Sequence, residues 1–239
     1  RNLLWHLCMT PVTLLLEDDM RILAVVRTIE LLVTLATFAW LVPVCRAARC
    51  HPLTPFLVFA FPFYAWGAVE FRADPPMTLL LVGSLWALSK ERPILAGVFS
   101  GLAYLMLQKA AFHGIAIGAG ILLSGMGVRT LLRYSVPATL ISLLPFPIAY
   151  ATRIGDFYYE CAYQCSGVFA SYHQKTPFLK SMPVLVFGIE VQAIPVIFLA
   201  AAIGLGIWWR GGQKYERMLA VALVVDFIVV FGTKLAFKN

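Results

Sequence analysis

Long runs without charge dominate this sequence and restrict the folds it can adopt. Residues 52–69 contain no charged side chain, and similar runs recur along the 239-residue chain. The sequence is 61% hydrophobic and 13% charged, with a mean hydropathy of +0.83, whereas soluble domains have about 25% charged residues. A soluble domain of this length needs more polar residues to cover its core. The composition therefore predicts a polytopic membrane protein.

A helix that crosses a bilayer needs about 20 predominantly apolar residues, and the apolar runs provide about eight candidate spans. We therefore expect an all-α fold, a polytopic transmembrane helix bundle that forms one domain over residues 1–239. Residues 2–16 are expected to form an interfacial segment before the first span. The expected spans are residues 20–44, 52–69, 76–88, 93–108, 110–128, 134–152, 184–209 and 218–237.

Alternate threading of these spans sorts the polar loops onto two sides of the membrane. Short loops on one side carry many basic residues and few acids, which predicts that this side is cytoplasmic. The opposite side receives most acids and the longest polar segment, residues 153–182, an outer loop with an interfacial amphipathic stretch. Its aromatic side chains form either an ordinary interfacial belt or a platform for a lipid substrate. The basic residues on the cytoplasmic side are Arg46, Arg49, Lys90, Arg92, Arg129, Arg133, Arg210, Lys214 and Arg217.

Neither the net charge of +7 nor the five cysteines indicate a protein that binds nucleic acid or is held together by disulfides or zinc. The basic residues lie in short clusters between apolar runs, so membrane topology explains them better than nucleic-acid binding does. The cysteines are too scattered for a disulfide framework or a zinc site. We expect an integral membrane protein of a plasma (inner) membrane or an ER-type membrane.

Charged groups also occur inside the expected spans, where each costs about 2.5 to 3.5 kcal/mol even on the lowest insertion scales. Each is therefore expected to face the interior of the bundle. Arg27 and Glu30 are one helical turn apart and are expected to form an internal ion pair. Glu190, Gln192 and Asp226 are expected to make polar contacts between helices, with a functional role as the alternative.

The stretch GAVEFRADPPM, residues 67–77, places Glu70, Arg72 and Asp74 between an uncharged run and two prolines. The prolines end one helix and begin the next, so this corner can hold charged groups at fixed positions. Asp74 can bind a divalent cation or the hydroxyl of an acceptor, and Arg72 offers a planar fork to a phosphate. An ion-pair cluster that only ends a helix is the alternative.

A second group, in LMLQKAAFHG, is brought to the same side by the threading. Lys109 lies at a joint between two spans, and His113 follows one helical turn later. Together they can bind an anionic lipid headgroup. The alternative is a lysine whose amine extends to the interface and a hydrogen-bonded histidine of the core.

The order of these features resembles the GT-C superfamily of integral membrane glycosyltransferases, in particular dolichyl-phosphate-mannose protein mannosyltransferases and bacterial aminoarabinose transferases. The resemblance covers roughly residues 11–132. It rests on an arginine in the early span RILAVVRTIELLVTLATFAWLVPVCRAAR, an apolar helix ending in EFRAD, a short helix closing in SKERP, and the stretch AGVFSGLAYLMLQKAAFHG.

The resemblance implies a GT-C-like bundle that moves a sugar from a polyprenyl-phosphate donor to a lipid, glycan or protein acceptor on the extracytoplasmic face. A divalent metal ion (Mg²⁺, Mn²⁺ or Zn²⁺) often assists. Asp74 and Glu70 are then the candidate catalytic residues, with Asp74 near the metal or the acceptor and Glu70 orienting Arg72. Arg72, Lys109 and His113 would face the donor phosphate. The family's first helix and its principal acidic loop should precede residue 11, so we expect the chain to be a fragment that also lacks a C-terminal part.

Two other classes of function remain open at this point. A secondary transporter would use Glu190, Asp226 and Arg27 near the middle of the membrane. Transporters often contain helices broken by glycine or proline, and Pro137, Pro145, Pro147 and Pro195 are expected to interrupt helices here. The sequence shows no convincing internal repeat, which transporters often contain. A non-catalytic subunit of a membrane assembly is the third class.

Overall fold

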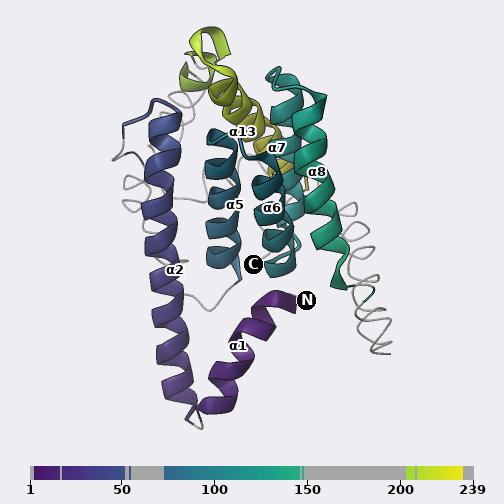
Figure 1. Ribbon diagram of the computed structural model, residues 1–239. Coiled ribbons are helices and arrows are strands. Elements are labelled where there is room, and N and C mark those ends of the chain that lie inside the picture. The colour runs from purple at the N-terminus through teal and green to yellow at the C-terminus, as the bar shows by residue number, and fades with distance from the viewer. Residues whose placement is uncertain are drawn as a thin grey trace. The chain divides into compact units, whose positions relative to one another are not determined.

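The computed structural model describes residues 3–16, 18–51, 54, 73–145, 147, 203–207 and 209–233. The regular structure in these ranges is helical, which confirms the all-α class predicted from the sequence (Figure 1). The helices are α1 (Leu3–Leu15), α2 (Asp19–Ala47), α5 (Asp74–Ser89), α6 (Pro93–Met106), α7 (Ala110–Leu123), α8 (Val128–Leu143) and α13 (Lys214–Thr233).

The chain divides into two compact units, which are described separately. The first consists of Arg1–Gly114 and Arg129–Pro145, and the second of Ile115–Val128 and Phe146–Asn239. Helices α1, α2, α5 and α6, the start of α7 and nearly all of α8 belong to the first unit. The second unit contains the rest of α7 and α13. The prediction of one transmembrane domain over residues 1–239 stays a prediction.

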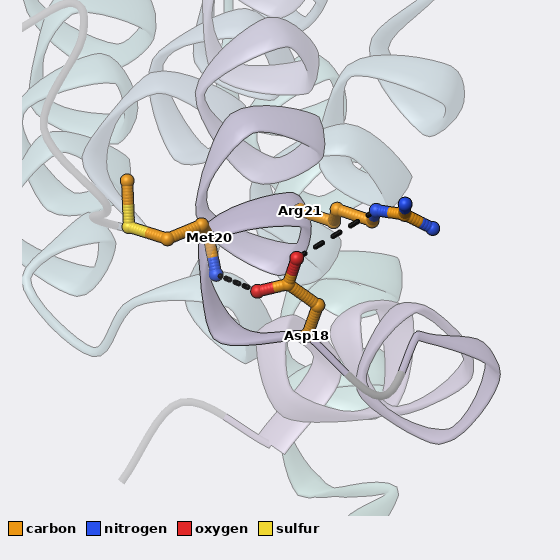
Figure 2. A network of polar contacts seen from close by, with 3 residues as sticks. All are labelled: Asp18, Met20 and Arg21. Carbon is orange, nitrogen blue, oxygen red and sulfur yellow. Dashed lines mark hydrogen bonds and ion pairs between the residues drawn. The ribbon is translucent and has the colours of Figure 1, made fainter.

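Helix α2 has a defined cap at each end. The Asp18 carboxylate accepts a hydrogen bond from the Met20 amide at 2.9 Å, and Arg21 Nε lies 3.6 Å from the same carboxylate (Figure 2). At the other end Arg49 takes a φ of 55°, and the Cys50 amide donates to the Cys45 carbonyl at 2.8 Å. This is the bond pattern of a Schellman motif, which satisfies the last carbonyls of the helix.

A tight corner of residues 90–92 joins α5 to α6 and makes them antiparallel neighbours (Figure 1). Here Glu91 has a φ of 56°, and the Arg92 amide donates to the Ala87 carbonyl at 2.9 Å, which repeats the Schellman pattern. The short connection makes α6 return along α5, as the alternate threading of these two spans predicts.

Helix α2 packs along α5 and runs parallel to it. Near the start of both helices, Val26 and Ala73 share one buried apolar cluster. Near the other end, the Trp40 ring lies 5.7 Å from the Trp86 ring and 5.5 Å from the Phe99 ring of α6, the latter edge to face. Aromatic pairs at these separations stabilise the contact beyond the area they bury.

Helix α6 approaches α8 unusually closely because two glycines face it. A Cβ at Gly97 would lie 2.1 Å from the Tyr134 carbonyl oxygen, and one at Gly101 would lie 2.8 Å from the Ala138 carbonyl oxygen. The spacing of four residues puts both glycines on one helix face, as in the GxxxG contacts of membrane helices. Gly97 faces Tyr134, and four residues later Gly101 faces Ala138. The two helices therefore run in the same direction.

Pro137 does not interrupt its helix, so this expectation is wrong. It lies inside α8, and its ring packs against α6, with Cγ 2.7 Å from the position of a Cβ on Gly97. A neighbouring helix can compensate for a proline within a helix that it covers.

The predicted boundary between residues 110–128 and 134–152 is also wrong. Helix α7 ends at Leu123 and α8 begins at Val128. Gly125 and Gly127, between them, have φ values of 78° and 95°, a backbone conformation that ends a helix and that glycine adopts without strain. The first turns of α8 contain arginines, which limit an apolar span but do not prevent helix formation.

One helix among the described residues, α2, is long and apolar enough to cross a membrane. Its 29 residues correspond to about 44 Å at 1.5 Å per residue. The apolar helices α6 and α7 have 14 residues each, about 21 Å, which is shorter than a hydrocarbon core of about 30 Å. The predicted span 52–69, the outer loop 153–182 and most of the span 184–209 lie outside the described residues.

In the second unit, α7 and α13 pack closely through a small residue. A Cβ at Gly120 would lie 2.6 Å from the Met218 carbonyl oxygen. Helix α13 begins at Lys214, four residues before the predicted span, because the Gln213 amide donates to the Glu216 carboxylate at 2.8 Å. A glutamate that bonds back to the first amide in this way is a common helix start.

Polar and apolar side chains are distributed unusually over the first unit. Leu32 and Leu35 of α2 are 59% and 50% exposed, and α8 has an apolar stripe at helical spacing that is similarly exposed. The buried polar side chains lie on α2, α5 and α6. The stripe consists of Leu132, Val136, Leu140 and Leu143, and the buried polar residues are Glu30, Thr34, Thr37, Ser84 and Ser100.

Candidate functional site

The candidate site lies at the end of the first unit where α5 begins. Asp74 is the first residue of α5 and is half-buried, and prolines at the next two positions fix the backbone of this turn. The Thr78 hydroxyl donates to the Asp74 carbonyl at 2.8 Å. The first turn of a helix is a favourable place for a carboxylate because the helix dipole is positive there. The prediction that the proline pair begins a helix is confirmed.

The corner between α6 and α7 lies at the same end. Ala73, directly before Asp74, belongs to a buried apolar group that we call the α1 cluster, and Leu107, two residues before Lys109, packs against it. Asp74 and Lys109 therefore flank one cluster, as the alternate threading predicts. The α1 cluster consists of Trp5, Met9, Val26 and Ala73, with Val12, Ile22, Ile29, Met106 and Leu107 packed against it.

Lys109 and His113 are both half-buried. The Phe112 amide donates to the Lys109 carbonyl at 3.1 Å, so the turn that connects the two residues is tightly wound. His113 directly precedes Gly114, whose carbonyl accepts a hydrogen bond from the Tyr134 hydroxyl at 3.1 Å. The structure thus places two of the three predicted phosphate-binding residues at one corner of the first unit, close in the fold to the start of α5.

Glu30 of α2 is completely buried, with no solvent exposure of its side chain. Val26, one turn earlier, belongs to the α1 cluster, and α2 runs parallel to α5. Val26 lies level with Ala73, directly before α5, and Glu30 lies about 6 Å further along α2. Glu30 is therefore roughly level with the first turns of α5, on the buried face of α2. This carboxyl group is therefore a further polar feature of the same end of the unit.

The expectation that Arg27 faces the interior together with Glu30 is wrong. Arg27 is exposed, whereas Glu30 is buried. A spacing of three residues allows two side chains to meet but does not enclose both of them. The packing of α2 buries the face that contains Val26, Glu30 and Thr37, and Arg27 lies at the edge of this face.

Several predicted site residues lie outside the described residues. These include Glu70 and Arg72, which directly precede the described start of α5, and also Glu190 and Gln192. Asp226 is half-buried in α13, in the second unit. The roles predicted for these residues stay predictions.

The described residues do not by themselves supply a metal site. Within these ranges no three His, Cys, Asp or Glu side chains gather into a set that could hold a metal ion. A magnesium or manganese ion needs about six oxygen ligands, several of which can be water or substrate. Asp74 supplies one carboxylate at this end of the unit, and its role as a metal ligand stays a prediction.

The opposite end of the first unit is basic. Helices α2 and α5 end there. Helix α6 begins there because it is antiparallel to α5, and α8 begins there because it is parallel to α6. All six basic side chains at this end are exposed, and Glu91 is the acidic residue among them. The grouping agrees with the predicted threading, and its assignment to the cytoplasmic face stays a prediction. The six are Arg46, Arg49, Lys90, Arg92, Arg129 and Arg133.

The prediction from sequence missed a buried chain of hydroxyl groups in the first unit. Ser84 of α5 lies 3.0 Å from Ser100 of α6, which lies 2.9 Å from the Tyr134 hydroxyl of α8. The segment GVFSG, residues 97–101, contained a usable signal, since a GxxxG spacing brings helices close enough for short side chains to meet. No pattern in the sequence identified Ser84 or Tyr134 as the partners.

Comparison with known proteins gives no relative: no protein-family model, curated protein or solved structure matches this chain.

Proposed function

We propose that this chain belongs to a membrane glycosyltransferase, a GT-C-like bundle of about eight spans, that moves a sugar from a polyprenyl-phosphate donor to an acceptor on the extracytoplasmic face. The observation that carries the proposal is the separation of charge along the first unit. Asp74 and Lys109 flank the α1 cluster at one end, and six exposed basic side chains occupy the other. Under the positive-inside rule, the basic end is cytoplasmic and the Asp74 end faces outward.

The distribution of side chains supports placing this unit in a bilayer. Helix α2 is long and apolar enough to cross one. The exposed stripe of α8 and the exposed leucines of α2 suit a lipid environment, while Glu30, Thr34 and Thr37 of α2 are buried. Large exposed apolar surfaces on a protein indicate contact with a membrane or a partner, and polar side chains within a bilayer turn toward the interior of a bundle.

The proposed reaction is an inverting displacement at the anomeric carbon of the sugar. The hydroxyl oxygen of the acceptor forms a bond to that carbon. The bond from the carbon to the donor phosphate breaks, and its electron pair leaves with the polyprenyl phosphate. Asp74 accepts the hydroxyl proton. Lys109 and His113, with Arg72, stabilise the negative charge that develops on the leaving phosphate, and Glu70 orients Arg72.

The test measures sugar transfer by the full-length protein in membranes, using a labelled polyprenyl-phosphate sugar. We expect Asp74→Asn to lower kcat by about 10²-fold or more, because the carboxamide cannot accept the proton. Lys109→Gln removes a cation that contacts the phosphate, and we expect kcat/KM for the donor to fall by about 10²-fold.

Asp19→Asn is the matched control, since Asp19 is also an acid in the first turn of a helix but is exposed. It should retain full activity, and all variants should reach the membrane in equal amounts. Unchanged transfer in both Asp74→Asn and Lys109→Gln would exclude this site. Absence of transfer by the wild-type protein from any polyprenyl-phosphate sugar would exclude the function.

A further inference from the structure

The buried hydroxyl groups of the first unit form one continuous chain that ends on α7. The distances are 3.0 Å from Ser84 to Ser100, 2.9 Å from Ser100 to Tyr134, and 3.1 Å from the Tyr134 hydroxyl to the Gly114 carbonyl oxygen. The chain therefore links α5, α6, α8 and the first turns of α7.

The direction of each bond follows from the number of protons. A carbonyl oxygen can only accept, so the single hydroxyl proton of Tyr134 is donated to Gly114. Ser100 must then donate to Tyr134, and Ser84 must donate to Ser100. All three hydroxyl groups have a partner, and hydrogen bonds aligned in this way strengthen one another.

The three side chains are enclosed by protein. Ser84, Ser100 and Tyr134 are 0%, 5% and 3% exposed. Water cannot easily replace a bond that is lost at such depth, so removal of one hydroxyl leaves its neighbour with one hydrogen bond fewer. The chain therefore favours one arrangement of α5, α6, α8 and the first turn of α7 within the first unit.

The position of Tyr134 is itself fixed by close packing. Its backbone carbonyl lies against Gly97, where a Cβ would approach to 2.1 Å. Because the backbone of α8 rests directly on α6, the tyrosine ring extends from a fixed point toward Gly114. The ring thus acts as a spacer of defined length between α8 and α7.

The segment that receives this bond carries the residues proposed to bind phosphate. At the start of α7, three successive amides bond to carbonyls three residues earlier: Ala110 to Leu107, Ala111 to Gln108 and Phe112 to Lys109, at 2.9, 3.1 and 3.1 Å. Such tight turns are less stable than α-helix. The Tyr134 bond attaches the end of this turn, directly after His113, to the packed helices.

We propose that Tyr134 is a positioning residue whose hydroxyl, oriented by Ser100 and Ser84, holds the start of α7 so that Lys109 and His113 meet the donor phosphate. This inference rests on the proposed function. It adds that the position of the phosphate-binding residues on α7 is determined by α8, through Tyr134, which does not touch the donor.

The test compares Tyr134→Phe with the wild-type full-length protein in lipid vesicles. The variant keeps the ring and removes the hydroxyl. We expect amide hydrogen exchange in peptides that cover residues 110–114 to rise about 3- to 10-fold, the effect of losing one hydrogen bond between membrane helices. We expect KM for the polyprenyl-phosphate sugar to rise by a similar factor and kcat to change less than about twofold.

Ser142→Ala is the matched control because Ser142 also lies on α8, and its hydroxyl donates at 2.8 Å to Ala138 of the same helix. It should change neither exchange at residues 110–114 nor KM. Ser84→Ala removes only the far end of the chain, so it tests the inference if Tyr134→Phe does not fold, and a smaller rise in both quantities is expected.

Unchanged exchange at residues 110–114 in both Tyr134→Phe and Ser84→Ala would overturn this inference, even if the protein transfers sugar. Faster exchange with an unchanged KM would overturn it as well, because Tyr134 would then only stabilise the fold. Failure of the proposed function would appear separately, as a wild-type protein that transfers no sugar.

Discussion

The close contact between α6 and α8 makes Gly97→Ala the most informative stability experiment on this protein. The added Cβ would lie 2.1 Å from the Tyr134 carbonyl oxygen and 2.7 Å from Pro137 Cγ. Ordinary contacts begin at 3.4 Å, so the helices must separate by the difference between 3.4 and 2.1, which is 1.3 Å. The obstacle is backbone, which cannot rotate away as a side chain can.

The energetic cost has three parts. Overpacking of this kind costs about 1 to 3 kcal/mol. The 2.9 Å bond from Ser100 to Tyr134 can lengthen by only about 0.6 Å before it is lost. Loss of this bond and of the bond to Gly114 adds about 1 kcal/mol, at roughly 0.6 for each bond between membrane helices. Alanine recovers about 1 kcal/mol through its better helix propensity. We therefore expect a net loss of about 1 to 3 kcal/mol.

The assay is reversible unfolding in mixed detergent micelles, followed by tryptophan fluorescence. Trp40 and Trp86 lie in the ring contacts among α2, α5 and α6 and should report the loss of packing. Gly101→Ala should cost less than Gly97→Ala, since its closest backbone contact would be 2.8 Å. Gly114→Ala is the control, because its Cβ would lie 3.6 Å from the Tyr134 hydroxyl, an ordinary contact. Equal stability of the Gly97 and Gly114 variants would refute the geometry on which the hydroxyl chain depends.

Two further predictions concern the helix ends. Asp18→Ala removes the acceptor of the Met20 amide and should lower the free energy of unfolding by about 1 kcal/mol. Asp18→Asn should be nearly neutral, because the side-chain amide oxygen accepts the same bond. Equal losses of stability for the two variants in a urea titration would contradict this prediction. Glu91→Gly should raise the free energy of unfolding by about 0.5 to 1 kcal/mol, because glycine adopts the φ of 56° without the strain of a side chain. A lower melting temperature of this variant would count against the Schellman motif at residues 90–92.

Among the described residues, apolar runs predicted where helices occur, because a helix pairs its backbone polar groups within one segment and therefore suits an apolar environment. The starts of α2 and α6 agree with the prediction within one residue. The largest errors in the helix starts occur at α8 and α13, where charged residues occupy the first turns. Charge excludes a residue from a lipid core but not from a helix, so a criterion based on hydropathy places these starts too late.

The site could be predicted in part, because threading determines which end of a helix a residue occupies but not what the residue contacts. Asp74 and Lys109 occur at one end of the first unit, as predicted. The hydroxyl chain could not be predicted, since Ser84, Ser100 and Tyr134 are far apart in the sequence and each is an ordinary residue for its helix. The environment of Arg27 was misjudged for a related reason, since burial depends on where α5 packs and not on the spacing along α2.

The length of α2 has a consequence for a protein placed in a bilayer. Between the exposed Arg27 and Arg46 the helix rises about 28 Å, close to a hydrocarbon core of about 30 Å. In a thinner bilayer the hydrophobic mismatch would be relieved by a tilt of α2 or by local thickening of the lipid. Because α5 packs along α2 in parallel, both helices would tilt together, and the depth of Asp74 below the membrane surface would vary with bilayer thickness. Lipid composition would then act on the candidate site without binding to it.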